Sequence, residues 1–255
     1  MPFTISHAAV VLPFARPLAK WRLLSATVIG SMVPDFGLFM PWRPPRVETH
    51  SALGLLTFCL PVGLATFWIF QQLMKTAIVE VLPNAPYGRW HALAEPADIA
   101  SLKQWAFASV GVLAGAVTHL VWDGFTHEGA RGVRMIPALD DPVVDIAGHR
   151  LVGTRLLQDA SSLVGLVVVL AIVAYGLRPG AGPALNRALR PRERYTWILG
   201  YVLATLLFSL LALVLRHPPH ASRSLAVFAI AALRGCAAAL ILVSVALRLR
   251  LHANS

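Results

Sequence analysis

The chain has 255 residues, of which 57% are hydrophobic and 13% charged, and its formal net charge is +10. A soluble domain usually carries about a quarter charged residues, so this composition excludes an ordinary water-soluble fold. The basic residues gather between apolar stretches, as in the loops of membrane proteins, and they form no basic face on a soluble domain. We therefore expect membrane lipids, and no nucleic acid, as partners.

Two short apolar segments, residues 7–14 and 23–32, open the chain. A helix needs about 20 apolar residues to cross a bilayer, so neither segment is long enough to span one. Pro13 and Pro17 interrupt the first stretch early. We expect two short helices, covered by other helices and running down and up as a pair.

Five longer apolar stretches follow, and each can cross a roughly 30 Å hydrocarbon core. Backbone groups in lipid must bond within their own segment, so these stretches are predicted to be helices; their continuous apolar character also argues against a barrel. The fold class is therefore all-α, a polytopic bundle in a single membrane domain over 1–255. Residues 1–165 hold the candidate site and 166–255 supply additional helices. The spans are expected at 51–74, 102–122, 161–177, 195–215 and 224–247, with a long polar connector at 128–153.

Polar residues recur on the second of these spans. Gly111, Gly115, His119, Asp123 and His127 are each four residues apart, so neighbours share one helix face. The two glycines allow a neighbouring helix to approach closely. An imidazole and a carboxylate at i and i+4 can hold one metal ion, so His119 and Asp123 predict a metal site at this end of the span.

Three more residues are expected at the same end. His7 begins the first short helix, Asp35 ends the second, and His50 directly precedes the first full span. The first full span runs away from the membrane face at which His50 lies, and the second full span returns to that face. Five or six nitrogen and oxygen ligands at one depth suit Zn²⁺ or another divalent ion, and there is room in this set for one or two ions.

Other interpretations stay open. His119 and Asp123 are also compatible with a structural polar pair between helices, or, together with Arg234, with the ion path of a transporter. A structural membrane protein with a metal staple is a third reading. The depth of the site in the bilayer distinguishes these interpretations, because a transporter places its ligands near the midplane between two repeated halves. This sequence shows no repeat.

At these residues the sequence resembles a widespread family of bacterial integral membrane proteins. That family has an early Ser-His, a Gly-Ser-x-x-Pro-Asp stretch, a His heading a span and a His-x-x-x-Asp-x-x-x-His stretch. A related group is described as membrane-bound metal-dependent hydrolases, and the ligand order is similar to that of the zinc-dependent phospholipase C and nuclease superfamily. Here the matching residues are Ser6-His7, Gly30 to Asp35, His50, and His119 to His127.

The resemblance implies a ligand set. Asp35, His50, His119 and Asp123 would bind one zinc, and His7 a second, with Asp123 bridging; the motif also includes His127. The superfamily's later His-x-x-x-Glu stretch is absent, and its nearest replacement is Asp159. The last two spans lie outside the resemblance.

The implied activity is a hypothesis: a zinc hydrolase, phosphoesterase-like or phospholipase-like, in the bacterial inner (cell) membrane. Zinc-bound water would be the nucleophile, with Asp35 as general base and Asp123 bridging the ions. Arginines at the site face, such as Arg46, Arg131 and Arg134, would recognise a phosphoester or lipid-linked substrate. Lys and Arg are more numerous on the opposite face, so the site is expected to face the periplasm or exterior. The sequence leaves the substrate and the oligomeric state open.

Overall fold

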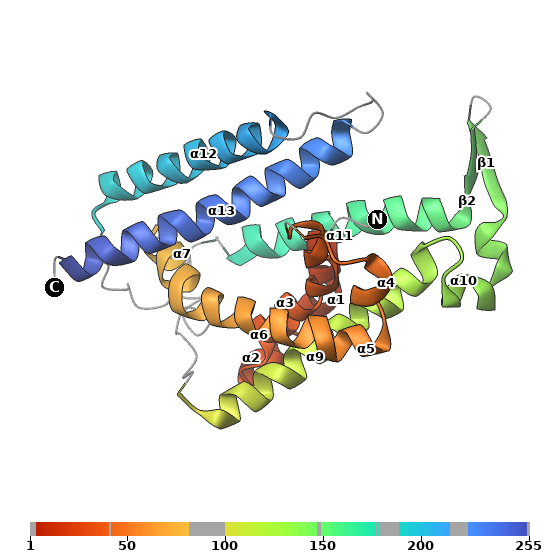
Figure 1. The fold of residues 1–255 in the computed structure, drawn as a ribbon, viewed down its shortest axis with the longest axis horizontal. Coiled ribbons are helices and arrows are strands. Elements are labelled where there is room, and N and C mark those ends of the chain that lie inside the picture. Colours follow the sequence, from red (N-terminus) through yellow and green to blue (C-terminus); the bar gives the residue numbers. More distant parts are fainter. Residues whose placement is uncertain are drawn as a thin grey trace. The chain divides into compact units, whose positions relative to one another are not determined.

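The computed structural model describes residues 4–40, 42–81, 100–146, 149–176, 178, 189–214 and 224–253. Across those residues it is helical almost throughout, which confirms the predicted all-α class (Figure 1). Five helices are long and apolar enough to cross a membrane, as predicted: Ala52–Val81, Leu102–Thr126, Gly153–Gly176, Pro191–Leu211 and Ile230–Leu251. The chain falls into two compact units, one within 1–67 and 98–176, the other within 68–97 and 177–255.

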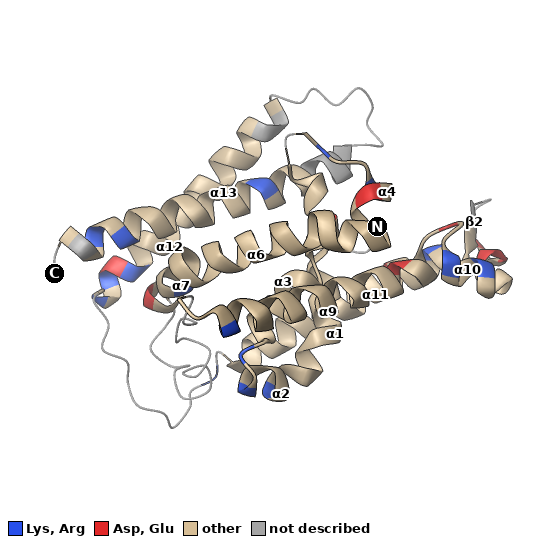
Figure 2. Ribbon diagram, turned by 60° about the horizontal axis from the view of Figure 1, so that its bottom comes forward, with Lys and Arg blue, Asp and Glu red and all other residues tan. Residues whose placement is uncertain are grey.

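The surfaces of these spans suit a lipid environment. Figure 2 shows Lys, Arg, Asp and Glu mostly at helix ends and in the segments joining helices, with long uncharged stretches between them. Leucines and valines such as Leu163, Val167, Leu206 and Leu210 are more than half exposed. Apolar surface of this extent is covered by lipid in a membrane protein and would be a liability in water.

The N-terminal segment is a series of short helical pieces. Because proline fixes φ and lacks an N–H, it suits short turns and the first turn of a helix. Pro13 and Pro34 lie in short 3₁₀ turns, and Pro17 lies in the first turn of a short α-helix. Together the pieces form the expected pair of short helical segments, over residues 4–20 and 24–38. They are η1 (Thr4–His7), α1 (Ala8–Val11), η2 (Leu12–Phe14), α2 (Ala15–Lys20), α3 (Leu24–Gly30) and η3 (Val33–Leu38).

The first full span follows the short helix α4 (Arg46–Thr49). It begins where the Ser51 hydroxyl accepts a hydrogen bond from the Gly54 N–H at 2.8 Å, an N-cap that satisfies one of the free donors of the first turn. Two wide π-helical turns interrupt its α-helical course, and such turns are often found near functional sites. Its pieces are α5 (Ala52–Gly54), η4 (Leu55–Cys59), α6 (Leu60–Ile69), η5 (Phe70–Met74) and α7 (Lys75–Val81).

The second span, α9 (Leu102–Thr126), packs against α3 through glycines. A Cβ atom added at Gly115 would lie 2.1 Å from the Thr27 carbonyl oxygen, and one added at Gly30 would lie 2.2 Å from that of Val112. Only glycine leaves room for backbones this close. The close approach expected from Gly111 and Gly115 is therefore present, and its partner is α3.

The segment between α9 and the third span differs from the expectation of a plain connector. It contains α10 (Arg131–Met135), η6 (Pro137–Asp140) and an antiparallel hairpin of β1 (Pro142–Ile146) and β2 (His149–Val152). The third span, α11 (Gly153–Gly176), begins directly after β2, eight residues before the predicted start. Apolar continuity did not reveal this start, because the segment from 154 to 160 contains polar residues. Helix turns that extend beyond the hydrocarbon core need no apolar sequence.

The second unit contains the last two spans, α12 (Pro191–Val214) and α13 (Ser224–Ala253), which pack along each other. Gly235 of α13 lies against Ser209 of α12, where an added Cβ would be 2.8 Å from the Ser209 backbone nitrogen. Arg234, next to it, is half-buried.

The glycine contact between α3 and α9 gives a first prediction. We expect Gly115→Ala to reduce the free energy of unfolding by about 1–3 kcal/mol, because the added methyl overlaps the Thr27 carbonyl. Thermal unfolding followed by circular dichroism in detergent measures the change. Gly200→Ala is the matched control, since this helical glycine has nothing within 4 Å of the added Cβ. A Gly115→Ala variant as stable as wild type would contradict the close packing of the two helices.

Candidate metal centre

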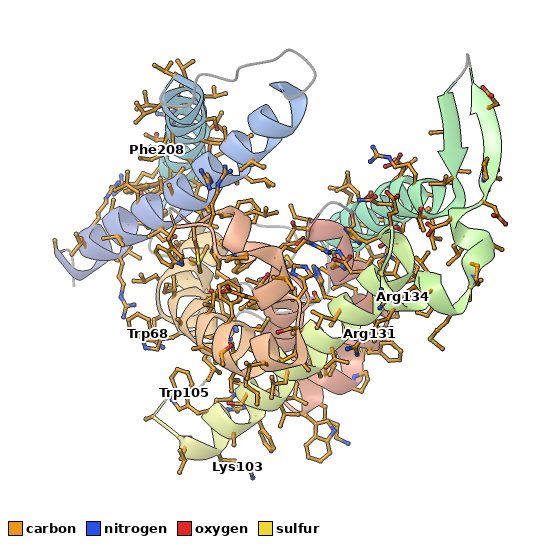
Figure 3. All side chains as sticks on the ribbon, turned by 45° about the vertical axis from the view of Figure 1, so that its right-hand side comes forward. Trp68, Lys103, Trp105, Arg131, Arg134 and Phe208 are labelled. Atoms are coloured by element: carbon orange, nitrogen blue, oxygen red, sulfur yellow. The ribbon has the colours of Figure 1, made fainter. Side chains whose placement is uncertain are left out.

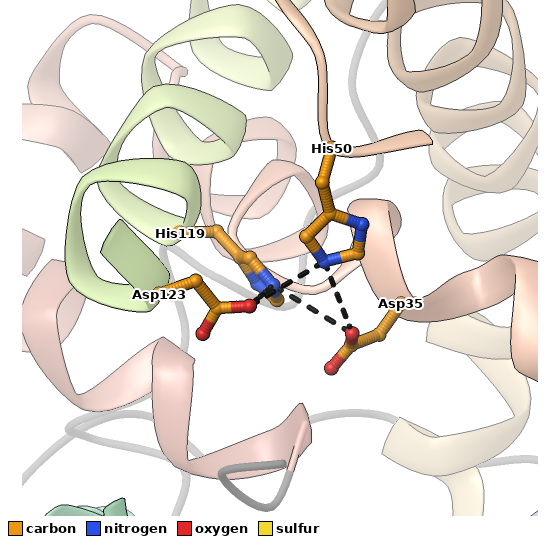
Figure 4. A group of neighbouring side chains, drawn as sticks. All are labelled: Asp35, His50, His119 and Asp123. Carbon is orange, nitrogen blue, oxygen red and sulfur yellow. Dashed lines mark ion pairs between the residues drawn. The ribbon is translucent and has the colours of Figure 1, made fainter. Parts of the chain in front are cut away.

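Two histidines and two aspartates meet in the first unit at the end of α9. His119 and Asp123 project from the last two turns of α9, Asp35 comes from η3, and His50 ends α4 just before the first full span (Figure 4). Asp35, His119 and Asp123 are buried, and the His50 side chain is only 9% exposed. One nitrogen or oxygen of each residue lies within 4.8 Å of the others, so the group could hold a metal ion.

The distances within the group suit a shared ion. The Nε2 atom of His50 lies 3.5 Å from Asp35 Oδ1 and 3.4 Å from Asp123 Oδ2. The Nε2 atom of His119 lies 3.7 Å and 3.4 Å from the same two oxygens. Two ligands of a tetrahedral zinc, each about 2.0–2.1 Å from the metal, are about 3.4 Å apart. These separations are longer than hydrogen bonds and match those of atoms around one small cation.

Hydrogen bonds on the far side of each ring fix which nitrogen faces the centre. The Nδ1 atom of His119 lies 2.8 Å from the Ser31 carbonyl oxygen, which can only accept, so Nδ1 carries the proton. The Thr49 hydroxyl donates to the Arg46 carbonyl and lies 2.8 Å from His50 Nδ1, from which it accepts. In the neutral form of each ring, the bare Nε2 atom therefore faces the carboxylates. Orientation of this kind is typical of histidines that bind metals.

Apart from Asp123 Oδ2, which accepts a hydrogen bond from Arg46, the inward-facing atoms have no hydrogen-bond partners within the described part of the chain. They are His7 Nε2, Asp35 Oδ1, His50 Nε2, His119 Nε2 and Asp123 Oδ1, all buried. Nitrogen lone pairs and carboxylate oxygens repel one another, and an unpartnered buried polar atom is costly. A cation between them removes both penalties, so this donor set fits a divalent metal.

The pKa values of the residues outside the spans show the same demand for positive charge. Burial lowers the pKa of His50, but the Asp123 and Asp35 carboxylates outweigh it, and the pKa is raised above the usual histidine range. Burial raises the pKa of Asp35, yet His50, His119 and the Thr4 hydroxyl, which donates to Oδ2 at 2.8 Å, hold it below the usual range. The centre is thus built for anionic carboxylates beside a positive charge.

His7 lies on the other side of Asp123. Its Nε2 atom is 3.6 Å from Asp123 Oδ1, whereas Oδ2 of the same carboxylate faces His50 and His119. Its ring stacks on His119 with centroids 3.7 Å apart. Burial, and then the nearby His119, lower the pKa of His7 to about 4, so the ring is neutral near pH 7 and its nitrogen is free to bind a metal.

Arg46 and His127 border the centre on its more exposed side. The Arg46 guanidinium donates to Asp123 Oδ2, and it lies 3.3 Å from His127 Nε2. The Nδ1 atom of His127 is 3.6 Å from Asp123 Oδ1 and 3.2 Å from the Asp123 carbonyl oxygen. Both ring nitrogens of His127 thus already have neighbours. Burial lowers the pKa of His127 below the usual histidine range.

Asp159 stands apart from the others. It lies on α11 with its side chain 60% exposed and pairs with Arg155 at 3.0 Å. The early start of α11 explains this position, because Asp159 falls in the second turn of the helix instead of at its beginning. The structure therefore brings together Asp35, His50, His119 and Asp123, with His7 and His127 beside Asp123, and does not bring Asp159 to them.

Sequence reasoning missed the residues that orient the ligands. Thr4, Ser31 and Thr49 each bond to one side chain of the cluster. Thr49 directly precedes His50, and Ser31 lies within the Gly-Ser-x-x-Pro-Asp stretch, so proximity to a candidate ligand was the available signal. Thr4 is too far from Asp35 in sequence, at 31 residues, for any local pattern to connect them.

A model of one protein family, the domain of unknown function DUF4184, matches residues 1–245. The chain belongs to the DUF4184 family. The match covers the cluster, the first four spans and most of the fifth. No curated protein and no solved structure matches the chain. The family description assigns no activity, so any function has to be argued from the site.

The orienting hydrogen bonds give a second prediction. We expect Thr49→Val to weaken metal binding about 10–100-fold, because loss of an outer partner frees the His50 ring to rotate and change tautomer. Isothermal titration of the metal-free protein with Zn²⁺ measures the affinity. Thr57→Val is the matched control: its exposed hydroxyl bonds only to the Leu53 carbonyl within its own helix. Equal affinities in the two variants would mean that Thr49 does not orient a ligand.

Proposed function

We propose that this protein is a membrane-bound zinc hydrolase that cleaves a phosphoester. One observation carries the proposal: buried nitrogen and oxygen atoms of Asp35, His50, His119 and Asp123 converge beside a partly exposed arginine. The converging atoms of Asp35 and of both histidines have no hydrogen-bond partner among the described residues, and the converging Asp123 oxygen accepts from Arg46. The resemblance of the motifs to membrane-bound metal-dependent hydrolases supports the same activity.

The donor set favours zinc. Two imidazoles and two carboxylates are the nitrogen and oxygen ligands that borderline divalent ions prefer, and the described cluster offers no thiolate. Asp35, His50, His119 and Asp123 would hold one ion, and His7 with Asp123 Oδ1 would contribute to a second. When bound, zinc would lower the pKa of a water molecule and polarise the phosphoester.

The protein's own groups would divide the remaining tasks. Asp35, with one oxygen held by Thr4, would accept a proton from the attacking water, the role of general base. Asp123 directs Oδ1 toward His7 and Oδ2 toward His119, and would hold these two sides of the centre at a fixed separation. Arg46 is 42% exposed on its side chain and already contacts an oxyanion, Asp123, so it would donate to a substrate phosphate in the same way.

The depth of the cluster supports hydrolysis over transport. Asp123 lies three residues and His119 seven residues before the end of α9, about 5 and 10 Å along the helix axis. His50 precedes the first span by two residues. A transport site is expected near the midplane of the bilayer, whereas this cluster lies toward one surface, where water and lipid headgroups are available.

Further arginines lie at the same end of α9. Arg131 and Arg134 come from α10, beyond the last turn of α9, and Figure 3 shows them far from Lys103 at the opposite end of that helix. Both side chains are exposed. Cationic groups around a cluster of histidines and carboxylates favour an anionic substrate such as a phosphoester.

Hydrolysis of bis-p-nitrophenyl phosphate by the purified protein tests the proposal. We expect activity that EDTA removes and Zn²⁺ restores. Asp123→Asn should lose bound zinc and at least about 100-fold in rate, since even outer partners of a metal site contribute 10–100-fold. Asp159→Asn is the matched control and should retain both, because Asp159 lies outside the cluster.

Elemental analysis of the same samples separates the outcomes. Zinc bound without hydrolysis in the wild type would reduce the centre to a structural staple. A protein without bound metal after zinc loading would contradict the metal site itself.

We further propose that the centre faces the periplasm or exterior, because Lys and Arg are more numerous on the predicted opposite face. In a background without Cys59 and Cys236, a cysteine at Ala138, beyond the site end of α9, should react with a membrane-impermeant maleimide in intact cells. A cysteine at Ala100, before the other end of α9, should be protected. The reverse pattern would place the centre in the cytoplasm. The sequence also predicts that a cysteine at Gly182, in the basic segment between the third and fourth spans, is protected; this position lies outside the described residues.

A further inference from the structure

An apolar groove of about 440 Å³ lies beside the metal centre, within the first unit. One wall is the N-terminal helical segment, with Ala9, Val10 and Pro13, and the other is α11. The Trp122 indole lines it from α9, and its N–H donates to the Ser161 hydroxyl at 3.3 Å. The groove is therefore bordered by three helical segments and lined almost entirely by carbon.

The groove follows one face of α11. Its lining residues there recur at the three- and four-residue spacing of a single helix face: Leu157, Ala160, Ser161, Val164, Gly165 and Val168. From the first to the last is about 16 Å along the helix, close to half of a roughly 30 Å hydrocarbon core. Since Leu157 lies near the site end of the span, the groove extends from the headgroup level through about one leaflet.

The groove is open on one side and borders the centre at His7. Val10 and Val164, on opposite walls, are 41% and 61% exposed although they line it. His7 lines the groove and also lies 3.6 Å from Asp123 Oδ1. A molecule in the groove would thus have its hydrocarbon side by side with membrane lipid and one end at the cluster.

We propose that this groove holds a hydrocarbon chain of the substrate, so that the protein acts on a membrane lipid whose phosphate lies at the centre beside Arg46. The inference rests on the proposed function. It adds the class of substrate, an amphiphile with a phosphoester headgroup. The geometry that carries it is the shared wall at His7: the same residue borders the apolar groove and the polar cluster.

Fluorescence of Trp122 tests occupancy without relying on catalysis. The probe is a dodecyl phosphate with bromine on its chain, because bromine quenches an indole only on close contact. The zinc-loaded protein in detergent should be quenched, and the quenched component should disappear in Trp122→Phe, which separates it from the other six tryptophans. Quenching that is the same in both proteins would overturn the proposal.

A bulky side chain introduced into the groove should exclude the probe. We expect Ala160→Phe to raise the dissociation constant about tenfold or more, the effect of losing roughly two buried methylene contacts. Ala171→Phe is the matched control, an exposed alanine on the same helix outside the groove, and should bind as wild type does. Equal weakening in the two variants would contradict the assignment of the groove.

A second probe, which lacks the phosphate headgroup, distinguishes a substrate from a structural lipid. Brominated dodecanol has the same chain without the phosphate, so wild type should bind it more weakly than the phosphate probe, and Asp123→Asn should abolish that preference. Equal affinity for the two probes would indicate a structural lipid only, and the proposal would fail.

Rates on p-nitrophenyl alkyl phosphates of increasing chain length keep this proposal separate from the hydrolase proposal. We expect KM to fall as the chain lengthens in wild type and in Ala171→Phe, and Ala160→Phe to lose that dependence. Cleavage with a KM independent of chain length would leave the hydrolase and remove the lipid substrate. Phosphate-dependent quenching without cleavage of any ester would retain the groove and remove the hydrolase.

Discussion

The backbone contact between α3 and α9 is the constraint on which the metal centre depends. Gly30, Gly111 and Gly115 let the two helices touch at their main chains. At that separation the Ser31 carbonyl reaches the His119 ring, and the turn that follows carries Asp35 to the same point. A wider spacing would leave His119 without the bond that sets its tautomer, and the two aspartates would no longer share one centre.

Much of this arrangement could be predicted from the sequence, because a bilayer restricts the possibilities. Span length and apolar continuity identified five helices, and counting crossings placed His50 and the end of α9 at one membrane face. The four-residue spacing of Gly111, Gly115 and His119 predicted both a close helix contact and a polar position just beyond it. Such inferences succeed where a property repeats along a single helix, since the period of the helix is known in advance.

The rest depends on contacts that no local pattern encodes. The bond from Thr4 to Asp35 joins two turns whose relative placement follows from packing against α9 and α11, and the partner of Arg46 depends on the path of an irregular loop. The hairpin formed by β1 and β2 is stabilised by pairing across a turn, with a register irregularity after Pro142, and apolar continuity carries no signal of it. Asp159 illustrates the same limit: α11 begins eight residues before the predicted start, so Asp159 lies in its second turn, exposed and paired with Arg155.

The order of the ligands along the chain has a consequence for biogenesis. His7, Asp35 and His50 all precede the first full span, whereas His119 and Asp123 lie near the end of the second. During synthesis these early residues therefore leave the ribosome well before their partners are made. Three polar side chains of the candidate centre are then present without the helix that buries them. The centre is completed only when α9 has entered the membrane and returned the chain to the starting face. Assembly of the candidate centre is thus tied to correct insertion of the first helix pair, and a chain inserted with the wrong topology would not bring these side chains together.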